Sequence, residues 1–207
     1  MSSPAQRLAA VISDIDRANA EDPRRVTLDG QTAAYETVYA RRMAARLASL
    51  YPEASELLQI AARAQHIRRW DIPRARYPEG RGGYETWRRA CRAHHVAVVS
   101  PILARHGYTE AEIAHVAKLI RKDELKRDPE SQALENVVAI VFVEHYIGEF
   151  LGKYADLTED KLIDILAKTL RKMSAEGHRA ALALPLDETV RGLIDKALTR
   201  IARPGAG

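Results

Sequence analysis

The sequence predicts an all-α protein, a single-domain helical bundle that covers residues 1–207. Apolar residues recur at intervals of three and four along most of the chain, a spacing typical of amphipathic helices. No stretch longer than four residues alternates apolar and polar side chains, so we expect no β-sheet. A chain of 207 residues with 46% hydrophobic residues can bury one substantial core.

The first three helices are predicted from their caps and apolar spacing. Ser3 and Pro4 supply a cap and a first-turn proline for a helix that ends before Asp22-Pro23. A second helix is expected over 33–50. Pro52 opens a third, in which Leu58, Ala62 and His66 recur at intervals of four.

The stretch from Asp71 to Gly83 contains two prolines and three glycines, and it predicts a long ordered loop. Loops of this length within a compact domain are more often functional than not. A fourth helix is expected from Tyr84, passing Pro101, with Trp87 and Cys91 on its core side.

Four further helices follow. Thr109 and Glu112 form a capping box for the fifth helix, and Thr158 caps the seventh. The sixth begins at Asp128-Pro129, and its middle, 137–143, is apolar on every side, which predicts a central, buried helix. The eighth is expected to begin at Asp187 and to end before Pro204.

Fixed positive charge is concentrated between Arg63 and Arg92, where nine arginines stand with three acids and no lysine. This window carries a formal +6 (nine minus three), whereas the whole chain carries +4. Guanidinium groups suit two-pronged recognition of phosphate or carboxylate, so we expect an anion-binding pocket. The alternative is a solvated loop with surface ion pairs, for which three acids are few. The predicted substrate-binding residues are Arg68, Arg69, Arg74, Arg81, Arg88, Tyr84 and Trp87.

Two histidines and one acid are candidates for a metal site. His66, His95 and Glu135 lie on three different predicted helices, 29 and 40 residues apart. Imidazole and carboxylate ligands of this kind bind zinc, manganese or ferrous iron. His94 is the alternative for the second histidine. Each histidine could equally be a core residue hydrogen-bonded to a carbonyl.

The order and spacing of these three residues resemble those of the HD-type metal phosphohydrolases. In that fold, separate helices supply His, His-Asp and a distant Asp to one or two divalent ions. The resemblance implies that His66, His95 and Glu135 are catalytic as ligands of Mn, Fe, Zn or Mg. Val96 stands where those proteins have the aspartate of the doublet, and Asn136 follows Glu135, so a bridging carboxylate is missing.

A second resemblance extends along most of the chain. It is carried by strings such as Gln65-His66-Ile67-Arg68-Arg69-Trp70, Tyr77-Pro78-Glu79-Gly80-Arg81 and Lys172-Met173-Ser174. On these strings the chain resembles the family Domain of Unknown Function 4202, found in bacteria and fungi. Fungal members are often labelled glutamyl-tRNA synthetase, but this chain lacks the strand–helix alternation and nucleotide-binding signatures of synthetases. The family motif has an aspartate after Leu-Glu, where this chain has Asn136.

Composition limits the function classes. No apolar run approaches the roughly 18 residues of a membrane span, and no signal peptide is evident, so we expect a cytoplasmic protein without a membrane partner. The single cysteine, Cys91, excludes an internal disulfide and a cysteine-rich zinc site. A net charge of +4 on 23.1 kDa permits RNA as a partner without arguing for it.

Two functions therefore remain open. The first is a metal-dependent phosphohydrolase that acts on a phosphorylated small molecule or nucleotide. The second is a non-catalytic helical module that binds an anion, a nucleotide or RNA. The grouping of His, Glu and Arg favours the enzyme, and the missing aspartate favours the binding module.

Overall fold

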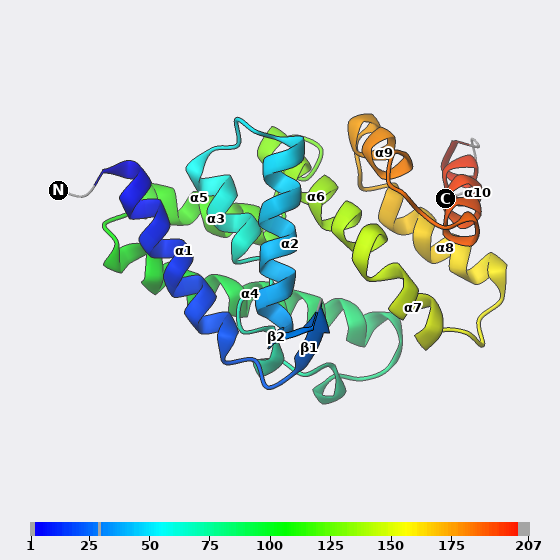
Figure 1. Cartoon of the computed structure of the whole chain (residues 1–207), viewed down its shortest axis with the longest axis horizontal. Coiled ribbons are helices and arrows are strands. Elements are labelled where there is room, and N and C mark those ends of the chain that lie inside the picture. Colours follow the sequence, from blue (N-terminus) through cyan, green and yellow to red (C-terminus); the bar gives the residue numbers. More distant parts are fainter. Residues whose placement is uncertain (1–2, 29, 203–207) are drawn as a thin grey trace. The chain divides into compact units, whose positions relative to one another are not determined.

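The structure is a computed structural model that describes residues 3–28 and 30–202. The protein is all-α, as predicted, apart from one small hairpin (Figure 1). The chain divides into two compact units, an N-terminal unit (Met1–Asp123) and a C-terminal unit (Glu124–Gly207), and each is described by itself. Single-domain organisation over 1–207 stays a prediction. Within 3–28 and 30–202, no helix is both long and apolar enough to cross a membrane.

The N-terminal unit is a group of helices around a core that includes Ile15, Met43 and Ile60, all fully buried. The first helix packs against the second, third and fourth, and the fifth packs against the third and fourth. Its elements are α1 (Pro4–Ala20), β1 (Arg25–Leu28), β2 (Gln31–Ala34), α2 (Tyr35–Leu50), α3 (Glu56–Arg63), the 3-10 turns η1 (Arg69–Asp71) and η2 (Arg74–Arg76), α4 (Gly80–Arg105) and α5 (Glu110–Arg121).

Helix caps fall where the sequence places them. The Ser3 hydroxyl accepts from the backbone N–H of Gln6, whose side chain in turn accepts from the Ser3 N–H. Thr109 and Glu112 make the same reciprocal pair at the start of α5. These boxes satisfy backbone donors that have no partner within the helix, which is why both predicted starts are confirmed.

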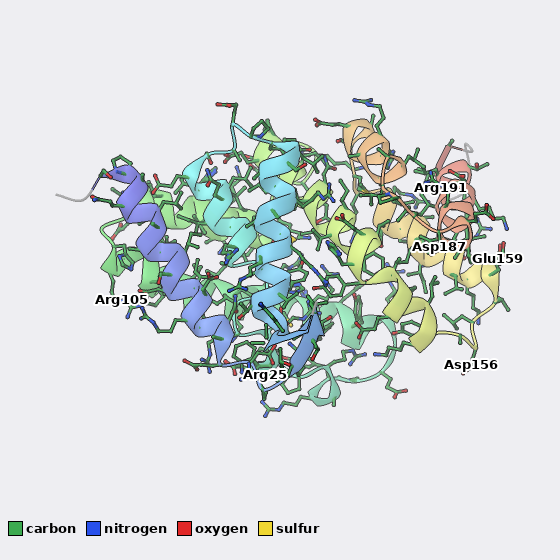
Figure 2. All side chains as sticks on the ribbon, in the orientation of Figure 1. Arg25, Arg105, Asp156, Glu159, Asp187 and Arg191 are labelled. Carbon is green, nitrogen blue, oxygen red and sulfur yellow. The ribbon has the colours of Figure 1, made fainter. Side chains whose placement is uncertain are left out.

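The hairpin corrects the expectation of no sheet. β1 and β2 pair antiparallel, with Thr27 opposite Thr32, and Arg25 projects from β1 (Figure 2). Each strand has only four residues, too few to show an alternating pattern. The turn between them uses Gly30 at φ 77°, a backbone region that glycine occupies without steric cost. Since β2 includes Ala34, α2 begins at Tyr35 rather than at residue 33.

His66 does not lie on the third helix, as the sequence had suggested. That helix ends at Arg63, and i→i+3 bonds such as the one from the Ile67 N–H to the Ala64 carbonyl tighten the chain into consecutive turns. Arg68 then adopts a left-handed backbone conformation (φ 50°), which redirects the chain into η1. Apolar residues at intervals of four near the end of a helix do not show whether the helix continues or gives way to such turns.

The loop predicted over 71–83 is ordered, as expected, but shorter. It contains η2 and the last residue of η1, and α4 begins at Gly80 rather than at Tyr84. Gly83 belongs to the first turns of α4 and lies directly against the loop, because a Cβ there would stand 1.9 Å from the carbonyl oxygen of Pro78. Gly83, one of the glycines that argued against a helix, therefore permits the loop to pack on the first turns of α4.

The C-terminal unit contains five helices within its described residues. The middle of α6 is buried as predicted, from Val137 to Val143, with Val138 and Phe142 partly exposed. Ser174 caps a short helix, α9, that the sequence analysis did not separate. Pro204, where the last helix was expected to stop, lies outside the described residues. The helices are α6 (Pro129–His145), α7 (Ile147–Lys153), α8 (Glu159–Leu170), α9 (Ala175–Leu182) and α10 (Glu188–Ala202).

Ion pairs join α8 and α10. Arg200 contacts Asp160 and Asp164, and Lys196 contacts Glu159 at the start of α8, which Figure 2 labels. Asp187 caps α10 by accepting from the backbone N–H of Val190 at 2.9 Å (Figure 2). These contacts orient α10 along α8.

We predict that Gly83→Ala destabilises the protein while Gly82→Ala does not. The added methyl group of the first variant would overlap the Pro78 carbonyl, and the cost of displacing backbone is about 1–3 kcal/mol. At Gly82 nothing lies within 4 Å of an added Cβ, so alanine should stabilise the helix by about 0.5–1 kcal/mol. Urea denaturation followed by circular dichroism measures both free energies of unfolding. Equal effects of the two substitutions would contradict the close approach.

Candidate functional site

His66 is the centre of a polar cluster in the N-terminal unit. Its ring stacks on Tyr39 of α2, with ring centroids 3.9 Å apart and planes inclined by 10°. The ring of His95, from α4, lies 6.0 Å from that of His66, centroid to centroid. The His66 side chain is 21% exposed and His95 is 1% exposed. Turns after α3 and the inner face of α4 thus bring the two imidazoles together.

Arg69 is the nearest cation to His66. Its Nη1 lies 2.5 Å from Nε2 of His66, and its Cζ lies 4.8 Å from the centre of the Trp87 ring. A guanidinium group can only donate, so Nε2 is the acceptor and Nδ1 carries the proton of the neutral ring. No carboxylate lies within ion-pair distance of Arg69 in the part of the chain that the structure describes. The charge of Arg69 is therefore not neutralised by direct contact.

A second arginine, Arg24, pairs with two carboxylates. Its Nη2 donates to Asp22 at 2.8 Å and to Glu36 at 2.7 Å, and both carboxylates are almost completely buried. Burial opposes the charge of Arg24, but the two hydrogen bonds outweigh it and raise the pKa of the guanidinium. Asp22 also accepts from the backbone N–H of Glu36, so this network connects the segment after α1 to the start of α2.

Glu36 has one oxygen without a hydrogen-bond donor. Its Oε1 accepts from Arg24, whereas Oε2 lies 3.4 Å from Nδ1 of His66 and has no hydrogen bond among the described residues. Burial raises the pKa of Glu36, and the charges of Arg24 and Arg69 offset part of this effect. An unsatisfied buried carboxylate oxygen can accept from a ligand or from water.

The pKa of His66 is lowered well below its usual value. Burial is the main cause, and the positive charges of four neighbours add to it: Arg69, Arg88, Lys122 and Arg24. His66 is therefore neutral at pH 7. Its lowered pKa also indicates that several cationic side chains surround its ring. The sequence analysis included Arg69 and Arg88 in such a convergence and missed Arg24 and Lys122.

The other predicted arginines are held by local contacts. Arg68 pairs with Asp71 at 2.9 Å and with Glu21, and Arg81, 90% exposed, pairs with Glu85 at 2.8 Å. Two of the three acids of the window are thus used by these two arginines, and the fold adds Glu21 from the end of α1 as a further partner of Arg68. Arg74 donates from Nη1 to the carbonyl of Tyr77 at 2.8 Å, which holds η2 in place.

The two neighbouring histidines of α4 have different partners. Nδ1 of His95 donates to the carbonyl of Ile67 at 2.8 Å, so the lone pair of the ring is on Nε2. Burial lowers the pKa of His95 to about 3. Nε2 of His94 lies 3.1 Å from the Arg68 carbonyl oxygen and 3.3 Å from Asp71, so His94 fastens η1 to α4. Cys91 on the same helix is buried, as expected.

Glu135 belongs to the C-terminal unit, where it is 5% exposed on α6, and its approach to the histidines stays a prediction. Over residues 3–28 and 30–202, no group of three or more His, Cys, Asp or Glu side chains is placed to hold a metal ion. The neighbouring Asn136 donates to the Ser174 hydroxyl at 2.8 Å and accepts from the Ser174 N–H at 3.0 Å. This amide ties α6 to the cap of α9, and an aspartate could not make the first of these bonds when ionised.

Glu36 is a further residue of the cluster that the sequence analysis missed. It stands on the face of α2 that carries Tyr39, Met43 and Leu47, at intervals of three, four and four. An acid in register with an apolar stripe is the signal that could have identified it, because such a carboxylate must be buried and needs a partner.

Protonation of His95 should reduce stability at acidic pH. Its pKa is lowered on folding, so the unfolded chain binds an additional proton between pH 6.5 and about 3. The stability that neutral His95 contributes is complete above pH 6.5 and decreases by roughly 1.4 kcal/mol per pH unit below it. We predict that the difference in free energy of unfolding between wild type and His95→Gln shrinks at this rate from pH 6.5 to 4.5. Urea titrations of wild type and His95→Gln across this pH range measure the difference, and a difference that stays constant would contradict the prediction.

No curated protein and no solved structure matches the chain. A family model described as "Domain of unknown function (DUF4202)" matches residues 9–194, which include the whole cluster around His66. The resemblance stated from the Gln65–Trp70 string and its companions is thereby confirmed. The chain belongs to the DUF4202 family.

Proposed function

We propose that the N-terminal unit binds a phosphate-bearing small molecule at the cations around His66. The observation that carries this proposal is Arg69, a partly buried guanidinium that contacts a neutral imidazole and an indole but no carboxylate within the described residues. One of its five N–H donors meets His66. The remaining donors and the full positive charge are suited to an anion.

The charges around His66 support the same proposal. Arg69 has no carboxylate partner among the described residues, and its charge acts on the neutral ring of His66 together with the charges of Arg88, Lys122 and Arg24. Cations gathered in this way repel one another unless a negative group offsets them. A phosphate ester supplies that charge together with several acceptor oxygens.

A second candidate is metal-dependent phosphate-ester hydrolysis. The observation that favours it is the pair of neutral imidazoles, His66 and His95, with ring centroids 6.0 Å apart. They would contribute two imidazole ligands to Mn, Fe, Zn or Mg, which would polarise a phosphoryl oxygen. In this candidate Arg69 would bind the phosphate beside the ion. The hydrogen bond from Arg69 to Nε2 of His66 competes with a metal for the same lone pair, so we place anion binding first.

We predict that inorganic phosphate and nucleoside monophosphates bind in calorimetric titrations at low salt. Arg69→Ala should weaken binding by about 1.5–3 kcal/mol, the value of a hydrogen bond to a charged group. Arg81→Ala should leave it unchanged, because Arg81 is exposed and paired with Glu85 on its own helix. A matched thermal melt of each variant separates lost binding from lost folding. Absence of any phosphate affinity in the wild type would refute the proposal.

The metal-dependent candidate predicts about one equivalent of transition metal in protein purified without chelator or nickel resin. Plasma emission spectrometry measures this content. His95→Gln should abolish it, since the variant removes one imidazole ligand while its side chain can still donate to the Ile67 carbonyl. Metal-free protein that also fails to take up Mn, Fe or Zn on dialysis would eliminate this candidate and leave anion binding intact.

A further inference from the structure

We infer that the phosphate-bearing ligand is a nucleotide and that its base stacks on Tyr84. The inference rests on the proposed anion site and adds the class of ligand. Tyr84 lies at the start of α4 and is 45% exposed, an unusual position for a large aromatic ring. Among the large hydrophobic side chains described in the N-terminal unit, only Leu28 of the hairpin is also exposed, at 41%.

Three flat groups connect the anion site to this exposed ring. The guanidinium of Arg69 lies over the Trp87 ring at 4.8 Å, and the Trp87 and Tyr84 ring centroids are 5.6 Å apart. Arg69 in turn contacts His66. The row therefore begins at a cation without a carboxylate partner and ends at an aromatic surface open to solvent. A ligand that satisfies both ends carries negative charge at one end and a flat ring at the other.

Trp87 gives this row a fixed geometry. Its indole N–H donates to the carbonyl of Ile72 at 2.8 Å, and the side chain is 9% exposed. Trp87 is therefore fixed in place and contacts both Tyr84 and Arg69. An aromatic surface that is already positioned loses little conformational entropy when a base stacks on it.

Arg88 adds positive charge at the aromatic end. Its Cζ lies 5.9 Å from the Tyr84 ring centre, and its Nη1 donates to the Tyr84 hydroxyl at 3.3 Å. The same guanidinium acts on His66. Positive charge thus extends along the row, as recognition of a base joined to a phosphate requires.

The arrangement of Arg69, Trp87 and Tyr84 favours a single nucleotide over a nucleic-acid strand. Proteins that bind single-stranded nucleic acid present successive aromatic side chains, one for each stacked base. In the described part of the N-terminal unit, Tyr84 is the one large aromatic side chain classed as exposed. The ribose of a mononucleotide is the natural spacer between a phosphate held by Arg69 and a base held by Tyr84.

The test compares ligands that differ by the base alone. Inorganic phosphate, ribose 5-phosphate and the four common nucleoside monophosphates are titrated calorimetrically into the full chain. In the wild type, a nucleoside monophosphate should bind about tenfold more tightly than ribose 5-phosphate, the gain expected from one stacked base. Tyr84→Ala should remove this tenfold gain, and Tyr84→Phe should retain it. Tyr154→Ala, a change of an exposed tyrosine of the C-terminal unit that is 38% exposed, is the matched control and should behave as wild type.

Each other outcome contradicts a different claim. If ribose 5-phosphate binds but nucleotides bind no tighter, or if Tyr84→Ala keeps the gain, the base site is refuted while the anion site stands. If neither phosphate nor ribose 5-phosphate binds, the anion site fails and the inference fails with it. If a short oligonucleotide binds far more tightly than the mononucleotide, with the same dependence on Tyr84, the ligand is a strand and the single-nucleotide inference is wrong.

Discussion

The N-terminal unit depends on one ion network, in which the half-exposed Arg24 bridges two buried carboxylates, Asp22 and Glu36. Removing two carboxylates from water is costly, and it is tolerated here because both accept hydrogen bonds from the same guanidinium. Asp22 also accepts from the Glu36 backbone N–H, so the network closes the chain around the hairpin between α1 and α2. It fixes the start of α2 and with it the position of Tyr39, on which His66 stacks. The polar cluster can therefore be traced back to this network.

Arg68 and Arg81 differ from Arg69 in their surroundings rather than in their chemistry. Arg68 and Arg81 have carboxylate partners within 4 Å and contribute little net charge to their neighbourhood. Arg69 contacts two uncharged rings and keeps its charge. Its role as the anion-binding candidate follows from the absence of a carboxylate next to it among the described residues, and the composition of the window could not reveal which arginine this would be.

Local features of the sequence predicted most of the helices correctly. The capping boxes at Ser3 and Thr109 act within four residues, so their outcome does not depend on distant contacts. The errors occurred where the local structure depends on contacts with other segments of the chain. Gly83 reads as a helix breaker in isolation, yet the approach of Pro78 requires a glycine there. The spacing of His66 from Leu58 and Ala62 predicted that it lies on the apolar face of the third helix. That helix ends at Arg63, and the chain changes direction at Arg68.

The sequence by itself determined the fold class, the family, the concentration of arginines and the presence of histidines near them, because composition, periodicity and short motifs are properties of the chain alone. The tertiary structure decided which of these residues act together. Glu21 reaches Arg68 across 47 positions, and Glu36 lies 3.4 Å from a histidine 30 positions away, since pairing of charges depends on distance in space. The tertiary structure also decided that the charge of Arg69 is not paired with a carboxylate, because the fold places the rings of His66 and Trp87 beside it.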